Sequence, residues 1–306
     1  MSATPDSPPL ERAAWLRMSE RGSGRLLHWY ARVSRRMGRR RSRWLLAPIS
    51  AYYVLFAPAA RRESKRYLRL ALAREPTLAD VWRHFHCFAT TIHDRVFLAR
   101  GELGELQVEL EGAEALNAAS EAGRGALLMG AHVGSFEVVN AVGRLQAGVP
   151  VAMAMYEENA RKMRALSDAL EPISPPRIVA LGRLDAMLQI RDLLDAGVFV
   201  GVLADRTLGA EPVQTVNLLG QPAEVPTGPM RAAALLRRPV LFMSGAYLGA
   251  GRYRVSITPL ADFTATSAAE RDRAVASAIE AYAQRLTALC REAPYNWFNF
   301  FPFWRS

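Results

Sequence analysis

The sequence predicts an α/β fold in which a mixed sheet is flanked by helices, preceded by a basic helical segment. Two observations carry this prediction. Short apolar runs next to glycine, such as residues 126–129 and 198–203, are typical of buried strands. Segments with helical spacing, such as residues 136–145, follow them along the chain. A length of 306 residues suits one large domain of this kind or two modest ones.

The amino-terminal part divides into two segments. Residues 1–20 begin with a polar, proline-rich stretch and are predicted to be disordered, without the pattern of a cleavable signal peptide. Residues 21–62 start with nine arginines up to position 43, interleaved with apolar residues at helical spacing. Residues 63–306 are then expected to form the catalytic domain.

An uncharged apolar run at residues 45–60 lies between two arginine-rich stretches. A bilayer-spanning helix needs roughly 20 apolar residues, and this run is shorter and contains Pro48 and Pro58. The segment is therefore expected to attach the protein to the inner membrane, either as an interfacial or re-entrant segment or as a single span. The rest of the chain would lie on the cytoplasmic side. The alternative is a buried helical hairpin with a solvated, arginine-rich face.

The net charge of +10 indicates an anionic partner. A membrane surface is favoured over nucleic acid because no nucleic-acid-binding motif is present and the arginines adjoin an apolar run. The two cysteines, Cys87 and Cys290, imply no disulfide framework. The group His84, His86 and His93 is interpreted as helix histidines, so neither a metal nor a cofactor is expected.

Further elements follow from the pattern of the chain. Residues 61–100 should be helical with a break at Pro76, and Thr77 and Asp80 resemble a helix cap. The proline-rich residues 222–229 should form a rigid loop. The remaining expected elements are a strand at 108–110, helices at 113–122 and 230–236, strands at 240–247 and 253–259, and an amphipathic helix from Ser267. The aromatic tail 295–304 is interpreted as a lid, a groove wall, a membrane-interface belt or part of the core.

The candidate catalytic residues are His132 and Glu137. His132 directly follows a predicted strand, where open α/β sheets place their chemistry. Gly134 lets the chain curl so that Glu137, in the next helix, can reach back to the imidazole. A neutral imidazole can accept a proton from an alcohol, and a carboxylate can fix its tautomer. No G-x-S-x-G nucleophile motif is present, so an acceptor hydroxyl is expected to attack directly.

Two further segments are predicted to bind substrate. Asp205 and Arg206 end another buried strand and should line the same cleft as His132, although a plain ion pair is the alternative. Thr227 and Gly228, next to Pro226, offer a hydroxyl and amide groups that suit a thioester carbonyl or a phosphate.

The segment AHVGSFE at residues 131–137, together with residues 39–68, 187–208, 216–242 and 294–304, resembles the lysophospholipid acyltransferase superfamily. The branch it resembles most is that of the bacterial late acyltransferases of lipid A assembly, of the lauroyl- and myristoyl-transferase type. The resemblance implies a glycerolipid acyltransferase-like fold, with His132 as base and Glu137 as its partner. It also implies substrate-binding roles for Asp205 and for the family's segment of small residues and proline, here Gly220, Pro226, Thr227 and Gly228.

Two departures from the family pattern concern the substrate. Relatives carry Asp-Gln where this chain has Asp205-Arg206, and an arginine where Glu157 follows Tyr156. A carboxylate at that position would repel a phosphorylated lipid A acceptor, unless Arg161, Lys162 or Arg206 compensates. Residues 155–159 and 294–300 resemble a sub-branch associated with aryl-polyene or related pigment lipids, which implies another acyl chain or acceptor.

The predicted function is transfer of an acyl-type chain from a thioester, on acyl carrier protein or coenzyme A, to a hydroxyl of a lipid or glycolipid. Three hypotheses compete with it. A thioesterase-like hydrolase would use His132 to activate water. A non-catalytic membrane adaptor would show a closed cleft, or no hydrogen bond between His132 and Glu137. A nucleic-acid binder would need the arginines and would lose affinity steeply with salt.

Overall fold

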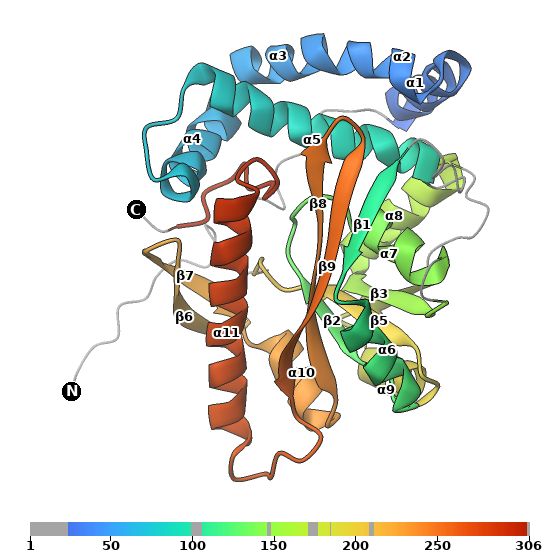
Figure 1. Ribbon diagram of the computed structural model, residues 1–306, viewed down its shortest axis with the longest axis vertical. Coiled ribbons are helices and arrows are strands. Elements are labelled where there is room, and N and C mark those ends of the chain that lie inside the picture. The colour runs from blue at the N-terminus through green and yellow to red at the C-terminus, as the bar shows by residue number, and fades with distance from the viewer. Residues whose placement is uncertain are drawn as a thin grey trace.

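The computed structural model describes residues 24–98, 106–145, 148–170, 177–183, 185–207 and 211–304. Residues 1–20, for which disorder is predicted, lie outside these ranges. In the described ranges a seven-stranded sheet runs through the molecule in the order β1-β9-β8-β2-β5-β3-β4 (Figure 1). Its strands are β1 (Gln107–Glu111), β2 (Leu127–Gly130), β3 (Val151–Tyr156), β4 (Arg177–Leu181), β5 (Phe199–Leu203), β8 (Pro239–Gly249) and β9 (Arg252–Asp262).

The sheet is mixed, as the sequence predicts. The strands β8 and β9 form an antiparallel hairpin, whereas every other neighbouring pair is parallel. The carboxyl ends of β2, β5 and β3 therefore meet at one edge of the sheet. Residues that follow these strands lie close together even when they are far apart in the sequence.

Helices cover both faces of the sheet. Alternate residues of β2 point to opposite faces, so Leu127 joins one buried cluster and Leu128 the other. The first cluster includes Ile279 of the long carboxyl-terminal helix, and the second includes Leu116 and Val139. The helices of this part are α6 (Ala113–Glu121), α7 (Phe136–Leu145), α8 (Glu157–Leu170), α9 (Ala186–Asp195), α10 (Gly228–Leu235) and α11 (Arg271–Glu292).

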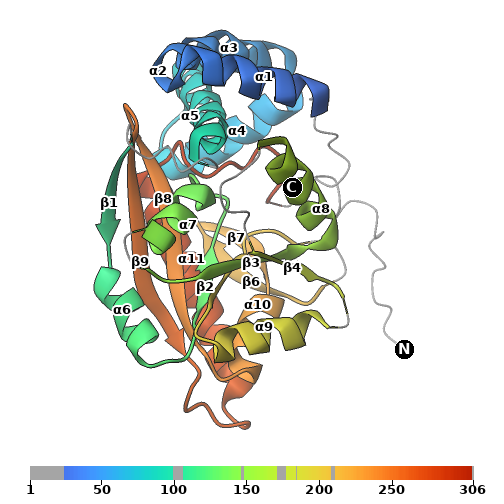
Figure 2. The same ribbon diagram turned by 90° about the vertical axis from the view of Figure 1, so that its right-hand side faces the viewer.

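The amino-terminal helices form a layer across one end of the sheet (Figure 2). They are α1 (Gly24–Met37), α2 (Arg39–Ser42), a short 3₁₀ turn η1 (Arg43–Leu45), α3 (Leu46–Phe56), α4 (Pro58–Leu72) and α5 (Leu78–Leu98). The predicted cap of α5 is confirmed: the Thr77 amide donates to Asp80 (2.8 Å), and the Asp80 amide donates to the Thr77 hydroxyl (3.2 Å). The boundary expected between residues 62 and 63 falls inside α4.

A buried ion pair fastens this layer to the sheet. Arg39 donates two hydrogen bonds to Asp94 of α5, at 2.8 and 2.9 Å, and the hydroxyl of Tyr253 on β9 donates a third at 2.8 Å. Arg39 is 5% exposed and Asp94 is fully buried. Because an unpaired buried charge is costly, the layer and the sheet are held as one unit.

The apolar segment that was expected to anchor the chain, residues 45–60, consists mainly of α3 and ends in the first turn of α4. The side chains of Leu46, Ser50 and Val54, four residues apart, are buried, whereas Leu55 and Phe56 are each 61% exposed. α3 is therefore a surface helix with an apolar outer face, not a buried hairpin. Among the helices in the described ranges, none is long and apolar enough to cross a membrane.

The prediction of a rigid loop at residues 222–229 is wrong. Instead, β6 (Val213–Leu218) and β7 (Gln221–Pro226) make an antiparallel hairpin outside the main sheet, and α10 follows at once. Proline is tolerated there because each strand of a two-stranded hairpin has a free edge, where no amide is needed for pairing. The strands β3, β4 and β6 had no prediction.

Candidate active site

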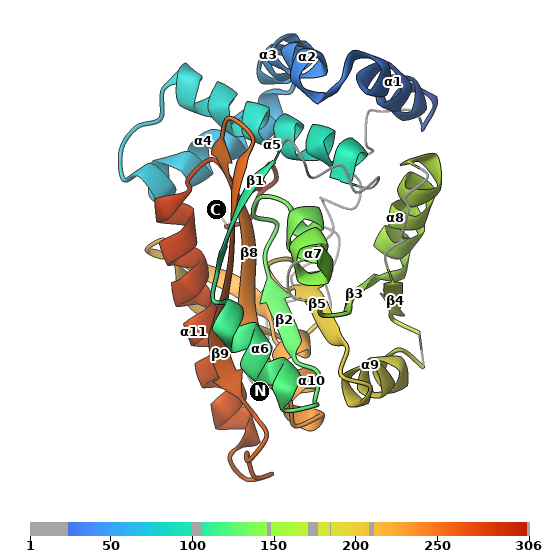
Figure 3. The same cartoon turned by 45° about the vertical axis from the view of Figure 1, so that its right-hand side comes forward.

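His132 lies in a short loop between β2 and α7, as the sequence predicts, and Figure 3 shows α7 beneath α5. The loop is fixed on two sides. The amide of Ser135 donates to the carbonyl of Gly245 on β8 (2.9 Å), and the amide of Gly134 donates to the carbonyl of Asn296 in the carboxyl-terminal tail (2.9 Å). Gly134 has φ of +63°, and a Cβ there would lie 1.9 Å from the Gly245 carbonyl oxygen. Only glycine fits this turn.

The imidazole of His132 is hydrogen-bonded to Asp205. Nδ1 of His132 lies 2.8 Å from Oδ1 of Asp205, and the backbone amide of His132 donates to Oδ2 at 3.1 Å. Asp205 follows β5, which pairs with β2, so the sheet order brings the two residues together. The side chain of His132 is 31% exposed, whereas that of Asp205 is 1% exposed. A buried carboxylate thus holds a partly exposed imidazole.

Charges around the pair fix its protonation. Burial raises the pKa of Asp205, but His132, Arg206 and the hydrogen bonds to Asp205 hold that pKa well below its usual range. An ionised carboxylate can only accept, so Nδ1 of His132 carries the proton and Nε2 has the free lone pair. Burial lowers the pKa of His132 from its ordinary 6.5, and the charges of Arg206 and Arg95 lower it further. The imidazole is therefore neutral at physiological pH.

Glu137 lies in the first turn of α7 but does not hydrogen-bond to His132. Its Oε1 forms an ion pair with Nε of Arg95 on α5 (2.7 Å), and its Oε2 accepts from the Ser135 hydroxyl (3.0 Å). The expected hydrogen bond between His132 and Glu137 is therefore absent. Taken alone, this absence is what the hypothesis of a non-catalytic adaptor predicts. The imidazole has another carboxylate partner in Asp205, however, and a histidine held in this way is able to act as a general base.

The carboxyl-terminal tail forms one side of the site. Trp297 is 1% exposed, and its indole N–H donates to Oδ2 of Asp205 at 2.9 Å. Arg206 donates to the carbonyl of Phe298 (3.0 Å) and stacks over the ring of Phe301, with 4.9 Å from its guanidinium carbon to the ring centroid. Asp205 therefore contacts His132 directly, and the charge of Arg206 acts on the same imidazole, whereas a substrate-binding role for either residue stays a prediction. The roles of Trp297 and Arg95 were missed, since nothing in their local sequence marks them.

The other expected substrate-binding residues lie apart from His132. Gly220 turns the hairpin tip, where its amide donates to Asn217 (2.9 Å), while Pro226 ends β7 at the other end of that strand. The amide of Thr227 donates to the carbonyl of Pro212 (3.0 Å), which closes the hairpin, and Gly228 begins α10. Arg161 is exposed on α8. In the described part of the chain, no recorded contact joins these residues to His132.

The helix histidines serve packing. His84 lies between the Ser64 hydroxyl (2.9 Å) and the Trp297 carbonyl (2.9 Å), and the ring of His86 stacks on Trp82. His93 lies between the hydroxyls of Tyr30 and Ser42. Within the ranges that the structure describes, no group of three histidine, cysteine or acidic side chains is placed to hold a metal ion.

The fold is thus a mixed α/β sheet in which a histidine held by a buried carboxylate follows the carboxyl end of a strand. The family model for bacterial lipid A biosynthesis acyltransferases matches residues 74–306, and the chain belongs to this family. The activity that this family indicates is acyl transfer to a lipid acceptor. No curated protein matches the chain in sequence.

Proposed function

We propose that the protein transfers an acyl chain from a thioester, carried by acyl carrier protein or coenzyme A, to a hydroxyl of a lipid or glycolipid. The observation that carries this proposal is the hydrogen bond of 2.8 Å between buried Asp205 and partly exposed His132. The mechanism differs from the sequence prediction in one respect, because Asp205 takes the place of Glu137 as the partner of the base.

In the proposed reaction, Nε2 of His132 removes the proton of the acceptor hydroxyl as the oxygen attacks the thioester carbonyl. The tetrahedral intermediate collapses by breaking the carbon–sulfur bond. The departing thiolate then takes the proton from His132, which returns to its neutral form. Asp205 keeps the tautomer fixed and stabilises the transient imidazolium. No covalent acyl-enzyme is required.

The basic surface suits either donor. Acyl carrier proteins are acidic and coenzyme A carries phosphates, so the net charge of +10 favours encounter with both. The region around Tyr156, where relatives carry an arginine, is acidic instead. The hydroxyl of Tyr156, at the end of β3, donates to Glu211 (2.8 Å), and Glu157 follows directly at the start of α8. Carboxylates here favour an acceptor without a phosphate at this position.

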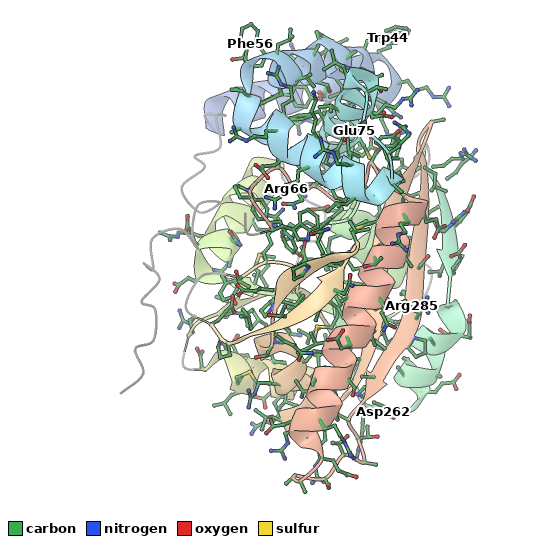
Figure 4. All side chains as sticks on the ribbon, turned by 90° about the vertical axis from the view of Figure 1, so that its left-hand side faces the viewer. Trp44, Phe56, Arg66, Glu75, Asp262 and Arg285 are labelled. Atoms are coloured by element: carbon green, nitrogen blue, oxygen red, sulfur yellow. The ribbon has the colours of Figure 1, made fainter. Side chains whose placement is uncertain are left out.

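We further propose that the outer face of α3 rests in the cytoplasmic leaflet of the inner membrane. Figure 4 shows Trp44 and Phe56 projecting outward from the amino-terminal layer, and Trp44 is 82% exposed. Leu55 and Tyr52 add apolar area at 61% and 52% exposure. Exposed arginines flank this patch at Arg36, Arg40, Arg41 and Arg62. An apolar patch with a basic rim is the pattern of a helix lying in an anionic interface.

Sedimentation with vesicles tests the membrane proposal. Wild-type protein should bind phosphatidylglycerol vesicles and bind phosphatidylcholine vesicles weakly. The double variant Leu55→Ser/Phe56→Ser should lose at least about tenfold in affinity, because each fully buried large apolar side chain contributes about 1.5–3 kcal/mol. The matched control Leu188→Ser/Leu235→Ser removes side chains of similar exposure from α9 and α10, at the far end of the molecule (Figure 1). Equal losses in both variants would refute a specific membrane face.

Lipid mass spectrometry tests the reaction. Cells with wild-type protein should contain a lipid that carries one more acyl chain than in cells with an equally expressed His132→Ala variant. With purified protein and acyl thioester, product should form only when lipid acceptor is added. Release of free acid at the same rate with and without acceptor would replace the proposal with a hydrolase. Identical lipid profiles and no turnover of the thioester would favour the adaptor.

A further inference from the structure

The carboxyl-terminal tail contacts the catalytic pair at two points: the backbone amide of Phe298 donates to the carbonyl of His132 (2.9 Å), and one side chain of the tail reaches Asp205. The indole N–H of Trp297 donates to Oδ2 of Asp205 at 2.9 Å, beside the backbone amide of His132 on the same oxygen. The other carboxylate oxygen, Oδ1, accepts from Nδ1 of the imidazole. With two donors on Oδ2, rotation of the carboxylate would break two hydrogen bonds. The direction in which Asp205 presents Oδ1 is therefore set in part by Trp297.

The tryptophan is itself fixed on several sides. Its backbone pairs with Val133 in an isolated bridge, next to His132 in the chain. Tyr67 of α4 packs edge-on against the indole, with ring centroids 5.2 Å apart. Nε2 of His84 on α5 donates to the Trp297 carbonyl at 2.9 Å, while Nδ1 of His84 accepts from Ser64. The amino-terminal helices thus hold the tail, and the tail holds the catalytic carboxylate.

His84 is suited to this support because it stays neutral. Burial lowers its pKa to about 4. A neutral imidazole has one donor and one acceptor nitrogen, and its two partners here need one of each: Ser64 donates and the Trp297 carbonyl accepts. The support of Trp297 should therefore persist through the physiological pH range.

We infer that Trp297 is a positioning residue of the active site, which orients Asp205, and through it His132, by its indole N–H. This inference rests on the proposed role of His132 as the base. The aromatic tail then does more than fill the core, since one of its side chains helps to orient the carboxylate that holds the base.

The structure offers a matched control in the same aromatic cluster. Trp304 is 4% exposed and its ring lies edge-on to Trp297, with centroids 5.8 Å apart. Within the described ranges, its indole nitrogen has no hydrogen-bond partner. Trp297→Phe and Trp304→Phe therefore remove the same atoms from the same cluster, and only the first removes a hydrogen bond to Asp205.

The test compares acyl transfer and the titration of His132 in the two variants and the wild type. A hydrogen bond to a charged group is worth enough that Trp297→Phe should lower kcat about tenfold or more, with KM little changed. The pKa of His132, followed by NMR, should rise, because a carboxylate with fewer donors attracts the imidazolium more strongly. Trp304→Phe should keep both kcat and the pKa of His132 near their wild-type values.

Equal effects of the two substitutions on kcat and on the pKa of His132 would overturn the inference and leave Trp297 a packing residue. If Trp297→Phe fails to fold, the indole N–H resonance of Trp297 can be followed in Asp205→Asn. It should move substantially, and no movement would also overturn the inference. The NMR titration does not depend on turnover. An inactive wild type would refute the proposed function while the titration still decides the role of Trp297.

Discussion

Replacing Asp205 with asparagine tests which carboxylate controls the base. In the wild type, Oδ2 of Asp205 accepts two N–H groups and Oδ1 faces Nδ1 of His132. An asparagine must turn its carbonyl oxygen toward those two donors, because its NH₂ group cannot accept from them. The NH₂ group then faces Nδ1, which has to accept. The imidazole proton moves to Nε2, where it blocks the removal of a proton from the acceptor.

The expected loss is large. The same reversal of the tautomer in serine proteases lowers kcat by about 10⁴-fold. We expect Asp205→Asn to lower kcat by about 10³- to 10⁴-fold, or about 4–5.5 kcal/mol. The fold should be retained, since asparagine keeps the size of the side chain and the bonds to both N–H donors.

Long-range ¹H–¹⁵N correlation spectra of protein labelled at histidine measure the tautomer directly. The signal of His132 is assigned by its loss in His132→Ala. Wild type should carry the proton on Nδ1, and Asp205→Asn on Nε2. The matched control is Glu137→Gln, which should keep the wild-type tautomer because Glu137 contacts Arg95 and Ser135 instead of the imidazole. A reversed tautomer in the glutamine variant, with Asp205→Asn unchanged, would refute the assignment of Asp205.

Three further predictions follow from the geometry. Because the base must be neutral and the pKa of His132 is lowered, kcat/KM should fall only as the pH drops below 6.5. Arg206→Gln removes a charge that lowers this pKa, so the fall should move to higher pH in a pH–rate profile. Arg39→Met should lower the free energy of unfolding in urea by about 3–5 kcal/mol, because it leaves the Asp94 carboxylate buried without its cation. Gly134→Ala should cost about 3 kcal/mol or more in the same assay, since its Cβ would collide with a carbonyl of β8; a loss below about 1 kcal/mol would contradict that geometry.

The sequence predicts well where the signal is local. The helix at residues 136–145 and the cap formed by Thr77 and Asp80 follow from spacing and side-chain chemistry within a few positions, and the structure confirms both. β3 and β4 were missed although they are no shorter than β2, which was predicted. The six residues of β3 form a mostly apolar run, and the periodicity of so short a run does not distinguish a buried strand from a helix core. The prolines at 222 and 226 suggested a loop because the sequence does not reveal which strand edge stays unpaired.

The partner of His132 shows the limit of sequence reasoning more clearly. Glu137 is five positions from the histidine, so a local argument favours it. Asp205 is 73 positions away, and only the pairing of β2 with β5 brings it to the imidazole. The sequence places Asp205 at the correct edge of the sheet, but no local pattern reveals that β5 is the immediate neighbour of β2. The contact of Trp297 with Asp205 is harder still to predict. It depends on the path of the carboxyl-terminal tail between the amino-terminal helices and the sheet.

We expect Glu137 to influence the base indirectly, through Arg95. The charge of Arg95 lowers the pKa of His132, and Glu137 neutralises that charge in an ion pair of 2.7 Å. Glu137→Gln leaves the arginine unbalanced, so the pKa of His132 should fall further and the base should become weaker. Its kcat should drop while the fall of activity in acid moves to lower pH.

The double variant Arg95→Gln/Glu137→Gln removes both charges and should restore the pKa of His132 toward the wild-type value. A double-mutant cycle on that pKa measures the coupling directly. If Glu137→Gln instead shifts the pKa by the same amount in the Arg95→Gln variant as in the wild type, the two residues act on His132 independently. In that case the ion pair would only join α5 to α7. If the coupling is present, the two carboxylates have separate roles at one imidazole: Asp205 fixes the tautomer, and Glu137 maintains the basicity.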